Sequence, residues 1–277
     1  MGNIKIAAKG SRKIKDDFYE ESNFLSNFVK NLEIDFNYPH DKNFGTELKF
    51  LKKLAAKKGL SYKVHAQYLS GGLNDVSERI RKETLKQIFY AIDRASYLNA
   101  SIVTMHPALQ PYGLKIPDSL DWEIKNYKKI AKYAARKKIL IGLENEAQTC
   151  FWFPDRACKF SQLMETVNTV NMDNFGFTLD VGHANVSGED YLSAIEKMGD
   201  KLFHIHAHDN FGGPAINLEK CGRVDPHLPL GQGVIDWGAL INKLKKINYQ
   251  NYLELENEVK DIEESLAYLK SLEKESS

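Results

Sequence analysis

Short apolar runs alternate with longer amphipathic runs from one end of the chain to the other. The short runs are at most six residues long and rich in β-branched, aromatic and Leu side chains, which is typical of buried parallel strands. The predicted strands are Asn3–Ala8, Leu32–Phe36, Tyr62–Ala66, Ser101–His106, Ile139–Glu144, Phe175–Asp180, Leu202–Ala207 and Tyr252–Glu256. The longer runs repeat apolar residues at helical spacing, which predicts helices at Ser77–Leu98, Asp121–Lys137 and Ile262–Leu272.

This alternation predicts an α/β protein that folds as a TIM (β/α)8 barrel. The strand starts lie roughly 30 to 50 residues apart, which is the pitch of a βα repeat. Eight such units fit a closed barrel better than the alternative, an open doubly wound sheet. The 277 residues agree with the about 250 that one such barrel needs. No stretch rich in Pro, Gly or Ser resembles a linker, so we predict one domain over residues 1–277.

Composition narrows the class of protein further. Lys and Arg total 38 against 37 for Asp and Glu, so bulk charge makes no case for nucleic-acid binding. No apolar run approaches the roughly 18 residues that span a bilayer, and the N-terminus lacks a signal-peptide core. Cys150, Cys158 and Cys221 are an odd number without a CxxC pair, which favours reduced thiols. We therefore expect a cytoplasmic protein with no membrane partner.

Ionisable or metal-capable residues follow the ends of six predicted strands. They are His65, His106, Glu144, Asp180, His183, His206, His208 and Glu256, and the long segment after the seventh predicted strand adds Asp209, Asp225 and His227. The carboxyl ends of barrel strands meet at one rim, so these side chains should converge. Crowded carboxylates repel one another unless a cation neutralises them. The mixture of imidazoles and carboxylates suits Zn, Mn or Co better than Mg or Ca.

Alternation of side chains along a strand leaves two choices open. Glu254 and Glu256 share one face of the last strand, and His204, His206 and His208 share one face of the seventh. The residues nearest the rim are favoured, which selects Glu256 and His206. His208 lies just beyond the strand and could orient a ligand or touch a substrate.

At these residues the sequence resembles the xylose isomerase-like TIM-barrel superfamily, which includes sugar-phosphate isomerases and epimerases as well as the endonuclease IV (AP endonuclease 2) group. The resemblance covers essentially the whole chain. Its most specific segment is Arg223–Trp237, where Asp225-Pro226-His227 precedes Gly231-Gln232-Gly233. The isomerase branch implies one divalent metal held by Glu144, Asp180, His206 and Glu256. It further implies that Glu144 and Glu256 move a proton while the metal stabilises an enediolate.

The endonuclease branch is the alternative, and it implies up to three zinc ions and abasic-site DNA as the substrate. Its additional ligands correspond to His65, His106, His183, Asp225 and His227. However, the first strand lacks the expected His with following glycines, and the second lacks a basic DNA-penetrating segment. Glu144–Gln148 also departs from the nuclease pattern, whereas Gly233–Trp237 resembles the isomerase branch. We therefore favour a sugar or sugar-phosphate isomerase or epimerase.

Two further residues are assigned to the substrate under the favoured interpretation. Trp152 would cover the sugar and exclude water, and Arg223 would meet a phosphate if the substrate carries one. The expected partner is a small sugar, and the resemblance makes a homo-oligomer an expectation too; nucleic acid belongs only to the alternative. A barrel that merely binds sugar is disfavoured, because binding alone does not need so many metal-capable residues at the rim.

Overall fold

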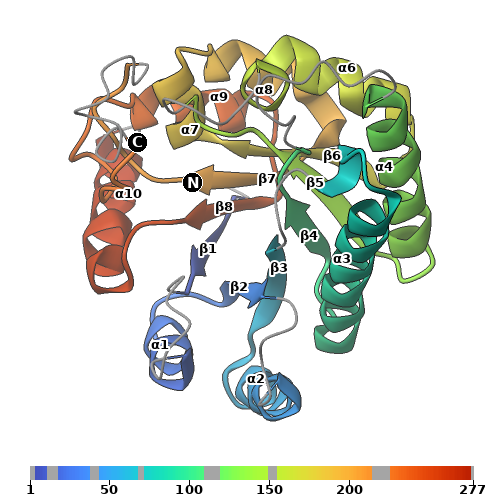
Figure 1. Ribbon diagram of the computed structural model, residues 1–277. Coiled ribbons are helices and arrows are strands. Elements are labelled where there is room, and N and C mark those ends of the chain that lie inside the picture. The colour runs from blue at the N-terminus through green and yellow to red at the C-terminus, as the bar shows by residue number, and fades with distance from the viewer. Residues whose placement is uncertain are drawn as a thin grey trace.

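The computed structural model describes residues 4–10, 18–37, 44–67, 72–108, 119–148, 155–213 and 225–275. Eight parallel strands close into a barrel in chain order (Figure 1). The strands are β1 Lys5–Lys9, β2 Asn31–Asn37, β3 Ser61–Gln67, β4 Ile102–Met105, β5 Leu140–Glu144, β6 Phe175–Asp180, β7 Leu202–Ala207 and β8 Tyr252–Leu255. The prediction of a single-domain TIM barrel is confirmed. The open sheet is wrong, because β1 pairs with β8 and leaves no edge.

Helices surround the barrel on the outside (Figure 1). They are α1 Phe18–Leu25, α2 Phe44–Lys58, α3 Glu78–Leu98, α4 Ser119–Ala135, α5 Asp155–Cys158, α6 Phe160–Val170, α7 Val181–Ser187, α8 Tyr191–Met198, α9 Trp237–Lys246 and α10 Ile262–Glu275. The three predicted helices correspond to α3, α4 and α10, with small differences at their ends. Among the helices that the structure describes, none combines the length and apolar character needed to cross a membrane.

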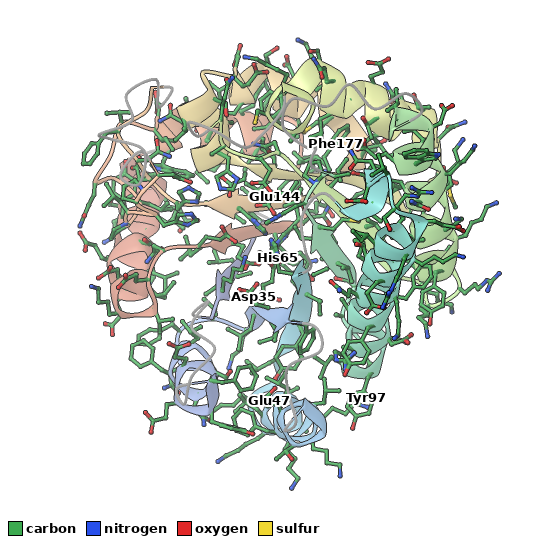
Figure 2. All side chains as sticks on the ribbon, viewed as in Figure 1. Asp35, Glu47, His65, Tyr97, Glu144 and Phe177 are labelled. Carbon is green, nitrogen blue, oxygen red and sulfur yellow. The ribbon has the colours of Figure 1, made fainter. Side chains whose placement is uncertain are left out.

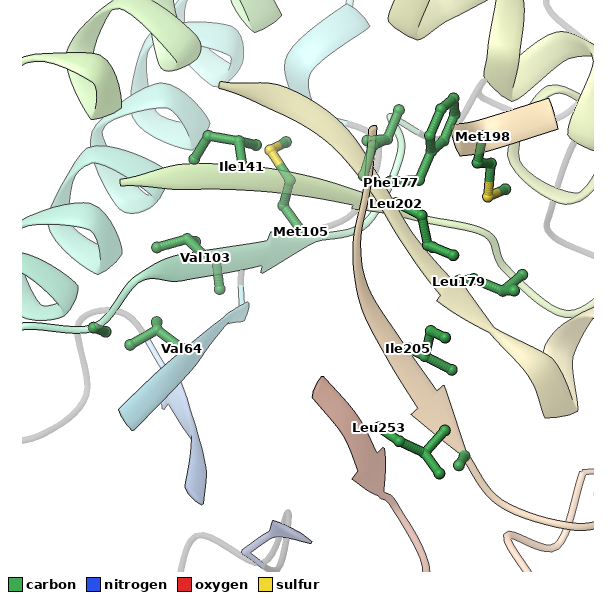
Figure 3. Close-up of a cluster of buried hydrophobic side chains, with 14 of the residues drawn as sticks. Val64, Val103, Met105, Ile141, Phe177, Leu179, Met198, Leu202, Ile205 and Leu253 are labelled. Atoms are coloured by element: carbon green, nitrogen blue, oxygen red, sulfur yellow. The ribbon is translucent and has the colours of Figure 1, made fainter. Parts of the chain in front are cut away.

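The hydrophobic core lies between the strands and the surrounding helices (Figure 3). Val103 and Met105 of β4 and Ile205 of β7 are completely buried and belong to this layer. Tyr127 of α4 packs against Phe175 of β6 with their ring centroids 5.4 Å apart. One set of alternate strand positions therefore supplies the apolar surface that holds the helices, which is where most of the hydrophobic stabilisation arises.

The other set of alternate positions gives the barrel an unusually polar interior. TIM-barrel interiors are mostly filled by Val, Ile and Leu, whereas here Glu33, His204 and Glu254 are completely buried. His204 Nε2 lies 3.1 Å from Glu33 Oε2 and 2.9 Å from Glu254 Oε2. Buried charges are stable only when they are paired and hydrogen-bonded. This ionic layer lies beneath the residues that end the strands.

Candidate metal centre

Four of the predicted ligands converge at the carboxyl end of the barrel. Glu144, Asp180, His206 and Glu256 each offer an atom, and these atoms all lie within 4.8 Å of one another. His206 Nδ1 lies 2.9 Å from Glu144 Oε1 and 3.2 Å from Glu256 Oε1. Glu144 and His65 are seen near the middle of the barrel in Figure 2, whereas Glu47 and Tyr97 lie on the outer helices. The structure thus brings together residues up to 112 positions apart in the chain (256 minus 144).

Asp180 shows how the local fold prepares one of these carboxylates. It ends β6 and caps α7, since its Oδ1 accepts a hydrogen bond of 2.7 Å from the backbone N–H of His183. Its Oδ2 is buried and accepts no hydrogen bond from the residues that the structure describes. A buried carboxylate oxygen without a donor is costly, and a cation is one way to satisfy it.

A second group adjoins the first through Glu144. His65 Nε2 lies 3.0 Å and His106 Nε2 lies 3.3 Å from Glu144 Oε2. Because His206 approaches the other oxygen of the same carboxylate, Glu144 belongs to both groups. The side chain of Glu144 is 1% exposed, whereas that of His106 is 26% exposed, so this group reaches the surface through His106.

A third group forms around Asp225 and consists of His183, His208, Asp225 and His227. Asp225 Oδ2 lies 3.3 Å from His183 Nε2 and 3.5 Å from His227 Nε2, and Asp225 Oδ1 lies 2.7 Å from His208 Nε2. His227 has a φ of +49°, a backbone conformation that non-glycine residues adopt rarely and that concentrates at functional sites. Apart from Asp209, every metal-capable residue predicted at the strand ends and in the long segment after β7 therefore lies in one of three adjoining groups.

In most of these imidazoles, the ring nitrogen that faces away from the group lies close to an acceptor oxygen. His106 Nδ1 lies 2.9 Å from Glu146 Oε1, and His206 Nε2 lies 3.4 Å from Glu33 Oε1. His183 Nδ1 lies 2.9 Å from the carbonyl oxygen of Asn145, and His227 Nδ1 lies 3.0 Å from that of Glu256. Such acceptors orient metal-binding histidines and select the nitrogen that faces the ion. The donors and their supports fit a divalent metal such as Zn, Mn or Co.

The charges of the three groups are strongly coupled. Burial by itself raises the pKa of Glu144, but the charge of His206 and hydrogen bonds from His106 and His206 outweigh it and hold that pKa well below its usual range. Burial lowers the pKa of His183, yet Asp180 and Asp225 raise it to about 9. Burial raises the pKa of Asp180 to about 6, since the opposing charges of His183 and His208 are partly offset by Glu256 and Glu144. Against burial, the carboxylates likewise raise the pKa values of His106, His206 and His208. Protons on these imidazoles balance the carboxylates, and a divalent cation would displace those protons.

Sequence reasoning missed three residues that β1 and β2 bring to this site. Lys9 is 3% exposed, and its Nζ lies 2.5 Å from Glu256 Oε1, 3.4 Å from Asp35 Oδ1 and 3.7 Å from Glu33 Oε1. Strand parity places Glu33 and Asp35 on one face of β2, which was the available signal. It was overlooked because charged residues in a strand usually face solvent.

The segment after β7 was expected to carry three metal-capable residues, but one of them, Asp209, is used in hydrogen bonds within the loop. Its Oδ2 accepts hydrogen bonds of 2.9 Å from both the backbone N–H of Gly231 and the indole N–H of Trp237. A side chain at Gly233 would come within 2.2 Å of Asp209 Oδ1 and of the carbonyl oxygen of Asn210. Asp209 and the Gly-x-Gly segment therefore hold the loop together. Trp152 and Arg223 lie outside the described residues.

Comparison with known proteins places this geometry in a family. The sequence profile described as xylose isomerase-like TIM barrel matches residues 28–272. The chain belongs to this family. Among solved structures, one described as a D-tagatose 3-epimerase-like protein superposes with a TM-score of 0.81 at 26% identity, covering 98% of this chain and 97% of that one.

Relatives found by sequence cover different shares of the chain. A protein of Methanocaldococcus jannaschii, described as uncharacterized, is 29% identical over 228 residues, which are 80% of this chain and 73% of the relative. An inosose isomerase of Bacillus subtilis is 37% identical over 97 residues, 35% of this chain and 34% of the enzyme. A probable endonuclease 4 of Thermoplasma acidophilum is 26% identical over 191 residues, 66% of this chain and 61% of that protein. The relatives thus include both an isomerase and a protein described as a probable endonuclease.

Proposed function

We propose that this chain is a divalent-metal-dependent isomerase or epimerase of a sugar or sugar phosphate. One observation carries the proposal: Glu144 from β5 and Glu256 from the end of β8 approach the same nitrogen of His206, at 2.9 Å and 3.2 Å. Two carboxylates facing each other across one centre are suited to removing a proton from one carbon and returning it elsewhere. The similarity to an epimerase-like protein along 98% of the chain supports this choice.

Glu144, Asp180, His206 and Glu256 would hold the metal, which would polarise the carbonyl of a bound sugar. Glu144 and Glu256 are the proposed acid–base pair. In the metal-free protein, His206 and the neighbouring imidazoles hold the pKa of Glu144 down against burial, so this carboxylate is ionised and available to bind a metal. Proton transfer by a positioned carboxylate contributes about 10²–10⁴-fold to a rate.

Other residues are assigned to binding. His183 lies 3.5 Å from Asp180 Oδ2 through its Nδ1 and would hold either the metal or a substrate hydroxyl. His65 and His106 contact the second oxygen of Glu144, which limits the directions that carboxylate can turn. Trp152 as a cover over the sugar, Arg223 as a phosphate contact, and a homo-oligomeric cytoplasmic enzyme stay predictions.

The direct test is hydrogen exchange on a panel of ketoses and ketose phosphates in deuterated water, followed by proton NMR. The metal-loaded protein should introduce deuterium next to the carbonyl of at least one sugar and produce its isomer or epimer. Chelation should stop the exchange, and Mn or Zn should restore it. A fully loaded protein that exchanges no proton on any member of the panel would rule the proposal out.

A second candidate, a metal-dependent phosphodiesterase acting on abasic-site DNA, is favoured by a separate observation. The three groups adjoin one another, because Glu144 belongs to two of them and His183 lies 3.3 Å from Asp225 and 3.5 Å from Asp180. Up to three ions could be held, and several close metal ions suit phosphodiester cleavage. Three zinc ions per chain, together with cleavage of an abasic duplex, would select this function over the first.

A further inference from the structure

Lys9 is a buried cation at this site to which the proposed mechanism gives no role. It ends β1 and is 3% exposed, whereas lysine is almost never buried unless it is paired. Three carboxylates surround its ammonium group: Glu256 Oε1 at 2.5 Å, Asp35 Oδ1 at 3.4 Å and Glu33 Oε1 at 3.7 Å. A positive charge is therefore built into the rim of the barrel beside one of the two proposed acid–base residues.

The three carboxylates around Lys9 have two different roles. Lys9 and Glu33 are register neighbours in the β1–β2 ladder, and Asp35 lies two residues further along β2 on the same face. These two carboxylates hold the ammonium group from the barrel wall. Glu256 differs from them, because the same oxygen that meets Lys9 Nζ also lies 3.2 Å from His206 Nδ1, inside the group proposed to hold the metal.

An ammonium group has three N–H donors that can turn toward different acceptors. When Glu256 serves the metal or moves a proton, Asp35 and Glu33 still keep the Lys9 ammonium group in place. A substrate oxygen that takes the present place of Glu256 Oε1 would then accept a hydrogen bond from Lys9 Nζ. In a dry site, a fixed donor aimed at an oxygen that gains negative charge is worth far more than it would be in water.

We propose that Lys9 is a further catalytic residue, which donates a hydrogen bond to the sugar oxygen that becomes negative during proton transfer. The inference rests on the proposed isomerase or epimerase function. As one Glu takes the proton, the C–H bond breaks and its electron pair forms a carbon–carbon double bond. The π pair of the carbonyl moves onto its oxygen, which Lys9 contacts. Return of the proton to carbon reverses these shifts, so Lys9 itself keeps all of its protons.

The simpler role, a counter-ion that merely neutralises carboxylates, predicts different behaviour. A counter-ion affects folding and metal retention but has no preference between substrate and the charged intermediate. A catalytic donor acts mainly after the substrate has bound, and thus lowers kcat more than it raises KM. It also favours a ligand that carries the charge of the enediolate over the neutral ketose.

The experiment compares Lys9→Met and Lys9→Arg with a matched control, Lys63→Met. Lys63 is also completely buried and interacts with Glu254 and Glu33, but it lies over the ring of Tyr252 at 3.5 Å in the deeper ionic layer. Each variant is loaded with Mn, its metal content and melting temperature are measured, and kcat, KM and the Kd of a sugar hydroxamate that mimics the enediolate are determined. The ketose is one that the unsubstituted protein turns over.

Lys9→Met should lower kcat at saturating metal by about 100-fold or more, which is the usual loss of one such donor. It should weaken hydroxamate binding by a similar factor and change KM less than about threefold. Lys9→Arg keeps the charge for Asp35 and Glu33 but moves the donors, so it should fold normally and still lose most of kcat. Lys63→Met should keep kcat within about threefold.

Three results would overturn the inference. One is normal kcat and hydroxamate affinity in folded, metal-loaded Lys9→Met or, if that variant does not fold, in Lys9→Arg. Another is a loss of activity that excess metal fully restores, since Lys9 would then act only through metal retention. The third is an unsubstituted protein that turns over no ketose, which removes the proposed function and this inference together. The first two leave the proposed function intact.

Discussion

Glu33 supports His206 from the side of the ring opposite to the proposed metal. Glu33 Oε1 lies 3.4 Å from His206 Nε2, while His206 Nδ1 faces Glu144 and Glu256. Glu33 is completely buried, and the charge and hydrogen bonds of the nearby histidines hold its pKa well below the usual range although burial opposes this. A carboxylate behind an imidazole fixes the orientation of the ring and raises its basicity.

Glu33→Gln should therefore weaken metal binding although Glu33 is not among the four proposed ligands. The expected loss of affinity is about 10–100-fold, the range typical for such supports, and competition with a chelator would measure it. Glu47→Gln, the same substitution on the outer helix α2 (Figure 2), is the matched control and should leave the affinity unchanged. Equal affinities for the two variants would mean that Glu33 does not orient His206.

Glu256→Gln tests the choice between two acidic residues that share one strand face. Gln keeps the shape of the side chain but cannot take up a proton, so turnover should fall by about 10³-fold, and metal binding should weaken as well. Glu254→Gln is the control, because Glu254 meets His204 at 2.9 Å in the deeper layer and is not in the group with Glu144 and Asp180. Steady-state kinetics would measure both variants. An inactive Glu254→Gln beside an active Glu256→Gln would show that the wrong acidic residue was assigned.

The metal-free protein should lose stability as the pH rises from about 7 to 10 because of two histidines. The pKa of His106 is raised to about 10 and that of His183 to about 9, since nearby carboxylates outweigh burial. Both groups titrate near 6.5 in an unfolded chain. A raised pKa stabilises the fold fully below the unfolded value, and this contribution disappears as the pH passes the folded value.

Comparison with the double variant His106→Gln, His183→Asn isolates this effect from other groups, such as Lys63, whose pKa burial lowers to about 8. The difference in melting temperature between the metal-free parent and the double variant should shrink from pH 7 to pH 10. Calorimetry at several pH values would measure it. A difference that grows over this range would have the wrong sign and would refute the proposed protonation of these imidazoles.

Gly182→Ala should damage the third group while sparing the first. A Cβ at Gly182 would lie 2.0 Å from His208 Nε2, the atom that lies 2.7 Å from Asp225 Oδ1, so the ring of His208 must move away. Any ion that the third group holds should be lost, which elemental analysis would measure, whereas Glu144, Asp180, His206 and Glu256 should still bind one. Gly45→Ala, where the added methyl group meets nothing within 4 Å, is the control. Unchanged stoichiometry in Gly182→Ala would show that the third group holds no ion.

The sequence by itself determined the barrel and the residues at its rim. The eight strands were predictable because apolar periodicity is a local property, and each prediction corresponds to an observed strand within a few residues. Strand ends such as Glu144 and Asp180 could be expected to meet, because all parallel strands in a barrel point the same way. The convergence of these side chains at one rim of the barrel followed from these two facts.

Only the tertiary structure decided the level of each strand residue along the barrel axis and the partners of each buried charged side chain. Parity placed Glu254 and Glu256 on one face but could not say which lies level with Glu144, since the stagger of strands in a closed barrel appears only in three dimensions. The tertiary structure also brought Lys9 from β1 beside Glu256, which is 247 residues away in the chain. Asp209 likewise resembled a ligand until its hydrogen bonds to Gly231 and Trp237 were seen, because the partner of a buried charge is set by packing and not by the adjacent sequence.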